Sequence, residues 1–488
     1  MARLERRKAL SAVLSGVLAA LAMPGFGAGP LVFVALVPLF FALSGKRRFL
    51  YGILFGATFM ALDFRWILTL YRFSPLVVPG LVLLVLYLSL FFGVASLVIR
   101  QSRTRPFQLL LVAPVAITLL EVVRAQGPLG TGFSSLYHAL YRTPSLIQIA
   151  SVLGPWAITA LIVLVNAAVF LAIRQRRLTY LIAAGAAVGL LAAFSLVPVA
   201  PARADPIRVA VVSSNVKQEE KLDGRNLRDL TERYIDLGRL AVAGNPDLVV
   251  FPESILPAFI LDDDELLERL SALAATGKTR VLFGTGVYRD REIYNTVALL
   301  SSSGDLLGTY EMVRPVPFGE YVPGRRIWEA IGLGRLVDSF LPVDLTPGEA
   351  FAPLDGIGTP ICFESTFPDP ARRLVENGAQ ILAIVTNDAW FVGSSELEAH
   401  FAAAVFRAVE TRRFVVQAAN SGVSGLVDPK GRILAATKRE EVLHGTVYAR
   451  TDRALYARWG DLPLLLLLGA GGLAFIAIRV RREKRNGE

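Results

Sequence analysis

The chain has a single cysteine, Cys362, which follows an apolar run in Pro360-Ile-Cys-Phe-Glu364. A lone free cysteine is usually a small buried hydrophobe, and it cannot form an intramolecular disulfide. At the end of a strand it is also well placed for chemistry, because open α/β sheets gather catalytic groups there. A thiol nucleophile needs a base to remove its proton and a group that stabilises the oxyanion. Cys362 is therefore a candidate nucleophile.

Two glutamates could support this thiol. Glu253 ends the apolar run Val249-Val-Phe-Pro-Glu253 and is a candidate base, although a strand-end glutamate can also simply cap the following turn. Glu320 lies in Pro317-Phe-Gly-Glu-Tyr-Val-Pro323, a proline-rich loop suited to holding a side chain in place. Three histidines and one cysteine cannot assemble a Cys/His zinc cluster, so no metal and no cofactor are expected.

These segments resemble the carbon–nitrogen hydrolase (nitrilase) superfamily and, within it, the apolipoprotein N-acyltransferase family. The resemblance covers nearly the whole chain, because several motifs occur in the same order. The further motifs are Gly132-Phe-Ser134, Val165-Asn-Ala-Ala168, Thr386-Asn-Asp-Ala-Trp-Phe391, His400-Phe, Phe406-Arg-Ala-Val-Glu410, Ala418-Ala-Asn-Ser-Gly422 and Asp428-Pro-Lys-Gly-Arg432.

The resemblance implies a four-layer αββα sandwich and a Glu-Lys-Cys triad. Glu253 matches the family's general base and Cys362 its nucleophile. Glu320 and Glu364 match acidic residues that support the site. The implied acyl donor is a phospholipid, the intermediate is a thioester, and the acceptor is the α-amino group of a lipoprotein's N-terminal diacylglyceryl-cysteine.

The position of the family's catalytic lysine departs from the pattern. It lies five residues before the proline of Pro-Phe-Gly-Glu, which here is Met312, and no lysine occurs between Lys278 and Lys430. Methionine keeps the length of lysine but lacks the ammonium. We expect much reduced turnover, whether Met312 is an introduced change or a natural variant. An alternative is that Arg314 compensates, since residues two apart on a strand share a face.

Aromatic residues are candidates for substrate contact. Phe133, Tyr137, Phe363 and Trp390 are expected to bind or admit lipid, although anchoring at the membrane interface explains such residues equally well. Phe363 stands where relatives often have tyrosine, which removes a polar group next to the nucleophile.

Hydropathy and charge indicate a membrane protein that holds these residues outside the cytoplasm. Hydrophobic residues make up 53% of the 488 and charged residues only 19%. Acidic residues outnumber basic ones by 36 to 28 between Asp205 and Asp461, whereas the apolar remainder has 23 basic and 5 acidic residues. A spanning helix needs about 20 apolar residues. Eight spans are predicted, at 9–27, 30–45, 49–70, 76–98, 107–124, 147–173, 178–199 and 461–479.

The basic clusters follow alternate spans, which puts both termini in the cytoplasm. The predicted organisation is a membrane domain of seven helices (1–203), an extracytoplasmic domain (204–457), and a last helix with a basic cytoplasmic tail (458–488). The expected location is the bacterial inner membrane, with the catalytic domain periplasmic and the chain monomeric. A cleaved signal peptide at the start is the alternative, but it would invert the remaining spans against their basic loops.

The extracytoplasmic segment alternates strand and helix patterns. Apolar runs such as 381–386, and 360–363 before the cysteine, are predicted strands, and 226–242 and 396–411 are predicted helices. This alternation is typical of an α/β sheet covered by helices.

Two other functions stay open. A membrane-tethered amidase or nitrilase would use water as the acceptor, and a catalytically dead binder would hold lipid or lipoprotein without turnover. Nucleic-acid binding is disfavoured because the basic residues lie beside the spans, where they are explained by orientation.

Overall fold

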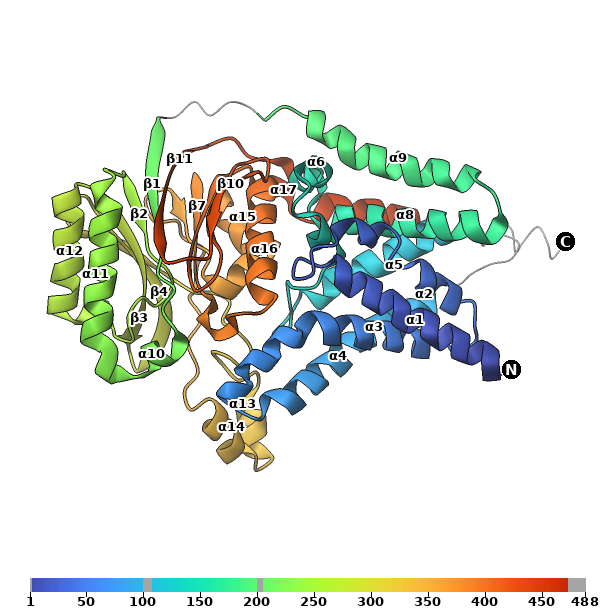
Figure 1. Ribbon diagram of the computed structural model, residues 1–488, viewed down its shortest axis with the longest axis horizontal. Helices are drawn as coiled ribbons and strands as arrows, with labels where there is room; N and C mark the ends of the chain where they lie inside the picture. The colour runs from blue at the N-terminus through green and yellow to red at the C-terminus, as the bar shows by residue number, and fades with distance from the viewer. Residues whose placement is uncertain (1, 100–107, 200–204, 473–488) are drawn as a thin grey trace.

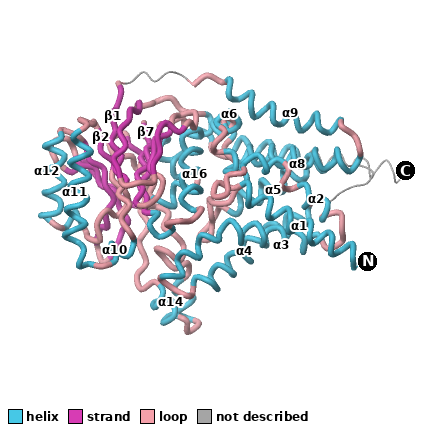
Figure 2. The backbone as a smooth tube through the Cα atoms, in the orientation of Figure 1, coloured by secondary structure: helices cyan, strands magenta, loops and turns pink. Residues whose placement is uncertain are grey.

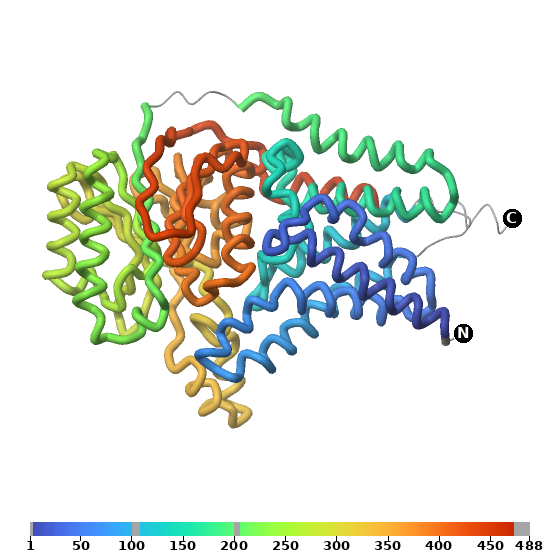
Figure 3. The backbone as a smooth tube through the Cα atoms, in the orientation of Figure 1, coloured from blue at the N-terminus to red at the C-terminus, as the bar shows by residue number. Residues whose placement is uncertain are grey.

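The computed structural model describes residues 2–99, 108–199 and 205–472. A bundle of apolar helices and a domain of two β-sheets lie next to each other (Figure 1). Figure 3 shows that the chain builds the bundle first, continues into the sheet domain, and returns to the bundle near residue 460.

The bundle contains long helices and shorter turns. They are α1 (Ala2–Ala22), η1 (Gly29–Phe33), α2 (Val37–Ala42), α3 (Arg48–Asp63), η2 (Phe64–Arg72), α4 (Val77–Val98), α5 (Leu109–Arg124), η4 (Leu136–Leu140), α6 (Pro144–Ile147), α7 (Ala150–Leu153), α8 (Trp156–Gln175), α9 (Thr179–Ala193) and η5 (Phe194–Leu196).

Among the described residues, four helices are long and apolar enough to cross a membrane, at Arg48–Arg72, Val77–Val98, Trp156–Gln175 and Thr179–Leu196. Gly29–Ala42 and Leu462–Gly472 are apolar but shorter. The last predicted span extends past the described residues, and the basic tail lies outside them. The total of eight spans therefore stays a prediction.

The span predicted at 147–173 begins later in the structure. Gly154 has a φ of 80°, and Pro155 follows it, so α7 ends and a new helix begins at Trp156. Proline's fixed φ suits a helix start, and glycine accommodates the left-handed turn before it.

The sheet domain alternates strands and helices. Its elements are β1 (Pro206–Ser213), α10 (Gln218–Leu222), η6 (Gly224–Asn226), α11 (Leu227–Ala243), β2 (Leu248–Val250), η7 (Ile260–Asp262), α12 (Asp264–Gly277), β3 (Arg280–Arg289), β4 (Glu292–Leu300), β5 (Leu306–Glu311), α13 (Arg325–Ala330), α14 (Gly334–Phe340), β6 (Ile357–Gly358), η8 (Cys362–Thr366), α15 (Pro368–Glu376), β7 (Ile381–Asn387), η9 (Asp388–Phe391), α16 (Glu396–Thr411), β8 (Val415–Asn420), β9 (Ser424–Val427), β10 (Ile433–Thr437), β11 (Glu441–Tyr448) and α17 (Leu455–Trp459).

Two sheets face each other between two layers of helices (Figure 2). One has the strand order β11-β1-β2-β3-β4-β5, and the other has the order β10-β9-β8-β7-β6. Helices α11 and α12 cover the first sheet, and α15 and α16 cover the second on the side of the bundle. Side chains alternate accordingly: Val209 and Val211 of β1 belong to the core between the sheets, whereas Ala210 and Val212 pack under α11 and α12. The predicted nitrilase-like α/β domain is confirmed.

The segment before the cysteine is not a regular strand. β6 covers only Ile357 and Gly358, Ile361 makes one isolated bridge with Val385, and Cys362 already begins the 3₁₀ turn η8. The prediction of a strand over 360–363 was therefore wrong. Helix α16, by contrast, occupies the predicted residues 396–411.

The bundle and the sheet domain are joined by buried polar contacts. Arg412, just after α16, donates to the Gln148 side chain at 2.6 Å and to the Ser151 hydroxyl at 2.8 Å. The Tyr141 hydroxyl donates to Glu398 at 2.7 Å. These contacts fix the second sheet against the helices that follow α5.

Candidate active site

Glu253 lies just past the end of β2 and is 7% exposed. Its carboxylate accepts hydrogen bonds from the Asn295 side chain at 2.7 Å and from the Asn387 backbone N–H at 2.7 Å. The neighbouring strand approaches closely, because a Cβ on Gly284 would lie 2.5 Å from the Glu253 Cα. Burial raises the pKa of Glu253, although these hydrogen bonds lower it.

Asn295, in the middle of β4, connects three acceptors. Its amide nitrogen is 2.7 Å from Glu253 Oε1, 2.9 Å from Glu320 Oε1 and 3.7 Å from Met312 Sδ. Glu320 also accepts from the Val316 backbone N–H at 2.7 Å. Burial and the nearby Glu253 carboxylate raise the pKa of Glu320 to about 7. The two glutamates and Met312, which are distant in sequence, thus meet around one amide.

Cys362 completes this cluster. It is partly exposed, and its backbone has a φ of 45°, a left-handed conformation that is rare outside glycine. Its thiol lies near the Glu253 carboxyl and Thr386, and both side chains act on its pKa. Burial, the charge of Glu253 and that of Asp388 raise the pKa of the thiol well above its usual value. A thiol in this environment needs a neighbouring base to remove its proton.

Glu364 holds the cysteine turn against the loop that carries Met312. One carboxylate oxygen accepts from the backbone N–H groups of Val313 and Arg314 at 2.8 and 3.0 Å, and the other accepts from that of Ile361 at 3.0 Å. The Tyr310 hydroxyl adds a contact at 3.1 Å. Burial raises the pKa of Glu364 to about 7 against the effect of these donors.

Arg314 does not replace the missing ammonium. Its guanidinium donates to the Ala125 carbonyl at 3.1 Å and stacks 3.8 Å over the Phe367 ring. Met312 instead is 2% exposed and points its sulfur at Asn295. The alternative in which Arg314 compensates is therefore wrong, because the side chain is already used in the junction with α5.

His400 supports the nucleophile turn from α16. Its Nδ1 lies 2.9 Å from Asp388 Oδ1, and its Nε2 lies 2.9 Å from both the Cys362 carbonyl and the Ser365 hydroxyl. Burial lowers the pKa of His400, but the charges of Asp388 and Glu396 outweigh this effect and raise the pKa to about 9. A protonated ring can donate from both nitrogens and hold the strained turn in place.

Donor atoms of Cys362, Asp388 and His400 lie within 4.8 Å of one another, close enough to suggest a metal site. Both ring nitrogens of His400 already have protein partners, however, and a metal bound to the ring would break at least one of those contacts. The donor set fits a hydrogen-bonded relay better than a metal centre.

The aromatic residues divide into two groups. The Phe133 ring lies between those of Trp66 and Phe363, at centroid distances of 5.6 and 6.3 Å, and so connects the bundle to the residue after the nucleophile. Trp390 is half-buried, and its ring packs on Phe73 at 5.1 Å.

Tyr137 is fully buried in the interior, with rings of Trp156 and Phe406 at 5.2 and 4.8 Å. It offers no surface to a ligand in this structure. This corrects the expectation of a lipid contact there, because the ring instead fills the junction between bundle and sheet domain.

Sequence reasoning missed Asn295, and it gave no role to His400 or Lys221. A polar residue inside the apolar run of β4 is a usable signal for Asn295, because buried amides need partners. His400 stood in a family motif, but its contact with the Cys362 carbonyl depends on how α16 packs on η8. Lys221 is buried on α10, a position that no sequence pattern marked.

A cysteine on a left-handed turn near a buried carboxyl, in a domain of two sheets covered by helices, is typical of a cysteine-dependent carbon–nitrogen hydrolase. The carbon–nitrogen hydrolase family model matches residues 208–461, and the model of the apolipoprotein N-acyltransferase N-terminal domain matches residues 15–168. The chain belongs to the apolipoprotein N-acyltransferase family. It is an enzyme of the acyltransferase class, and the family and the apolar helices make it a membrane protein.

Relatives match over nearly their full length. The apolipoprotein N-acyltransferase of Geobacter metallireducens is 35% identical, with 98% of this chain and 96% of the relative covered. That of Thermotoga maritima is 32% identical, with 97% and 94% covered. Among solved structures, the NitFhit protein of C. elegans is 17% identical, with 52% of this chain and 62% of the other covered and a TM-score of 0.41.

Proposed function

We propose that the chain moves an acyl group from a phospholipid to the N-terminal diacylglyceryl-cysteine of lipoproteins, through a thioester on Cys362. One observation carries the proposal: the only cysteine of the chain lies on a turn with a φ of 45° near the buried carboxyl of Glu253, and burial and the charge of that carboxyl raise the pKa of the thiol. The near full-length similarity to proteins named apolipoprotein N-acyltransferase supports the donor and acceptor classes.

In the first half-reaction, Glu253 takes the thiol proton, and the Cys362 sulfur attacks the ester carbonyl of the phospholipid. The ester C–O bond breaks, and the lysophospholipid alkoxide leaves with the proton that Glu253 returns. In the second, the acceptor amine attacks the thioester carbonyl, Glu253 takes a proton from the nitrogen, and the thiolate leaves and is reprotonated. Splitting the transfer into two steps lowers the barrier of each.

The neighbours of Glu253 have supporting roles in this scheme. Asn295 and the Asn387 backbone N–H orient the carboxylate, and Glu320 fixes Asn295 from the other side. Glu364 holds the nucleophile turn. Met312 fills the place where an ammonium would face the developing oxyanion, and removing one such stabiliser typically costs about 10²–10³ in rate. Turnover is therefore reduced in this chain.

Eight spans with both termini in the cytoplasm would put residues 204–457 on the periplasmic side of the bacterial inner membrane. Helices α13 and α14 support contact of this domain with lipid, because Ile327 and Ile331 are 67% and 61% exposed and lie one turn apart. Phe133 and Phe363, whose ring centroids are 6.3 Å apart, are the apolar side chains beside the Cys362 turn. We propose that a monomer binds both lipid substrates here, without nucleic acid or cofactor.

The test is the intact mass of the purified full chain after incubation with phosphatidylethanolamine. Acylation of Cys362 adds the mass of one acyl group, which a diacylglyceryl peptide then removes as it becomes N-acylated. C362S is the control and gains no mass. Free fatty acid without transfer to the peptide indicates a hydrolase, and bound lipid that never becomes covalent indicates a binder; either result overturns the proposal.

A further inference from the structure

Lys221 is a buried lysine without a hydrogen-bond partner. Its side chain on α10 is 4% exposed, and within the described part of the chain its Nζ contacts no acceptor. Lysine is almost never fully buried unless it is paired, because an ammonium loses its hydration there. A lysine enclosed in this way therefore needs a negative charge nearby that stabilises its ammonium.

The acid that α10 faces, through Asn387, is Glu253. Burial lowers the pKa of Lys221 to about 8, and Glu253 is the group whose charge opposes this effect. The placement of α10 agrees. Gln218, one turn earlier on the same face, accepts from the Asn387 side chain at 3.0 Å, and the Asn387 backbone N–H donates to Glu253 at 2.7 Å. One face of α10 thus turns toward the base.

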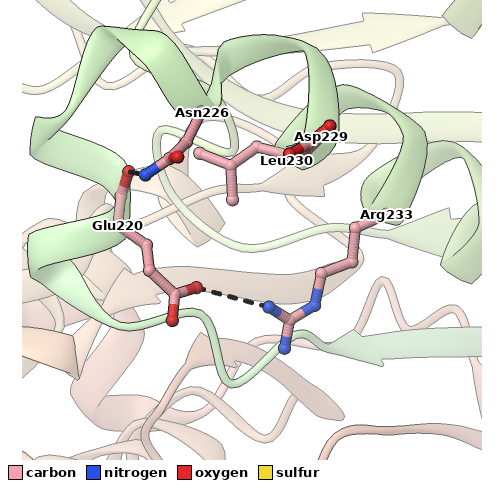
Figure 4. A pocket seen from close by; sticks show the side chains of 5 residues that line it. All are labelled: Glu220, Asn226, Asp229, Leu230 and Arg233. Atoms are coloured by element: carbon pink, nitrogen blue, oxygen red, sulfur yellow. Dashed lines mark hydrogen bonds and ion pairs between the residues drawn. The ribbon is translucent and has the colours of Figure 1, made fainter.

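The charges on the rest of α10 are paired elsewhere. Glu220 forms an ion pair with Arg233 at 3.5 Å, and its carbonyl accepts from the Asn226 side chain at 3.0 Å (Figure 4). These residues, together with Asp229 and Leu230, line a pocket of ≈ 180 Å³. Glu219 pairs with Arg72 at 3.2 Å. These contacts anchor α10 and leave Lys221 to Glu253.

The other cations near the site are occupied. Arg314 donates to the bundle, and His400 is neutralised by Asp388 at 2.9 Å and Glu396 at 3.5 Å. The remaining titratable neighbours of Glu253 are Glu320 and Cys362, and both become negative when they ionise. Met312 brings no charge. Without Lys221, three acidic groups would share one enclosed site with no uncompensated cation.

We infer that Lys221 is a positioning residue whose ammonium keeps Glu253 ionised, and so able to deprotonate Cys362, in a site where position 312 has no charge. This inference rests on the proposed role of Glu253 as the base. Lys221 acts on Glu253 and not on the oxyanion, so it preserves activation of the thiol without restoring the transfer rate that Met312 loses. Thiol reactivity and turnover therefore separate in this chain.

The experiment measures alkylation of Cys362 by iodoacetamide, followed as the intact mass of the full chain in detergent between pH 5.5 and 9.5. The single cysteine makes the mass change specific, and no phospholipid is needed, so failed acyl transfer and failed thiol activation are distinguished. The variants are K221M, K221Q, M312K and K221M/M312K. K217M, at an exposed lysine beside α10, is the matched control.

We expect K217M to match the parent chain. K221M and K221Q should both move the acidic limb of the profile up by about one pH unit, which is about tenfold slower alkylation at pH 7. In the M312K background, replacing Lys221 with Met should slow alkylation by less than about threefold, because the new ammonium at position 312 replaces the lost charge. Three results would overturn the inference. They are an equal loss of alkylation rate in the parent and M312K backgrounds, a pH profile that does not shift, and acidic limbs at different pH values for K221M and K221Q.

Discussion

Met312 is enclosed beside the Asn295 amide, at the place where the resemblance expects a lysine. Changing Met312→Lys would add an ammonium among Glu253, Glu320 and the oxyanion that forms on the Cys362 ester adduct. We expect phospholipid-dependent acyl transfer to rise about 10²–10³-fold, since one lost oxyanion stabiliser costs that much.

The rate of peptide N-acylation under single-turnover conditions measures this effect. M312L, which keeps shape without charge, is the control and should behave like the parent chain. Equal transfer rates for the parent and M312K would falsify the idea that position 312 limits turnover.

Glu320 makes stability depend on pH. The pKa of Glu320 in the folded chain, about 7, lies above its ordinary value of 4.5. Between these two pH values the folded chain therefore keeps a proton that the unfolded chain has released. The stabilisation of the folded state by protonated Glu320 is fully present below about pH 4.5, and it is lost as the pH rises through 7. Glu320→Gln should therefore flatten the pH dependence of unfolding, by about 2 kcal/mol between pH 5 and 8.

Thermal unfolding of the two chains at both pH values measures this difference. Glu329→Gln, at an exposed glutamate on α13, is the matched control. If E320Q and E329Q follow the same pH dependence, the carboxyl of Glu320 is not the group responsible.

At the level of single residues, the sequence predicted the acids and the thiol better than their partners. Glu253 and Cys362 could be found because each ends an apolar run, and the structure brings them close enough that burial and the charge of Glu253 raise the pKa of the thiol. The Asn295 amide reaches the site only through strand pairing, and Lys221 is enclosed only through the placement of α10. Those depend on contacts between distant segments, which no local pattern contains.

The 3₁₀ turn η8 and the loop after β5 form one unit through Glu364. Because three backbone N–H groups depend on its carboxylate, Glu364→Ala would leave buried donors without acceptors, each at a cost of about 1–3 kcal/mol. We expect a loss of about 3 kcal/mol or more in unfolding free energy. The Cys362 turn should also lose its left-handed backbone, and with it most alkylation.

Denaturant unfolding and Cys362 alkylation of the same sample measure these two effects. Glu376→Ala on α15, whose carboxylate pairs with Arg372 at the surface, is the control and should change neither by much. Normal stability of E364A would show that water replaces the carboxylate.

The boundaries of helices and strands were predicted well where the apolar periodicity was strong. They were predicted poorly where polar contacts determine where an element begins or ends. For α16 both predicted ends, Glu396 and Thr411, agree with the structure. The strand expected at 360–363 failed because Glu364 draws the Ile361 backbone N–H away from a ladder and into the turn.

On the scale of the whole molecule, α13 and α14 form an exposed apolar arm outside the sheets. Charging it with I327D/I331D should reduce acyl transfer from phospholipid vesicles about tenfold or more, because each buried apolar side chain contributes about 1.5–3 kcal/mol. Alkylation of Cys362 by iodoacetamide should stay unchanged, since the arm contributes nothing to the Glu253 cluster.

Initial acylation rates from vesicles, compared with alkylation rates, separate these effects. Leu240→Asp on α11 is the control, because Leu240 is 63% exposed in the layer farthest from the bundle. If L240D reduces transfer as much as the arm variant does, the arm has no special contact with lipid.

The junction of Arg412 with Gln148 and Ser151 also limits how the enzyme can meet its substrates. In the proposed orientation, a catalytic layer fastened to the helices at buried contacts would not swing away from the bilayer. Cys362 would stay at one height, so donor and acceptor would arrive one after the other by lateral diffusion along the leaflet. Substrates that lack a lipid anchor would then reach that height too rarely to compete.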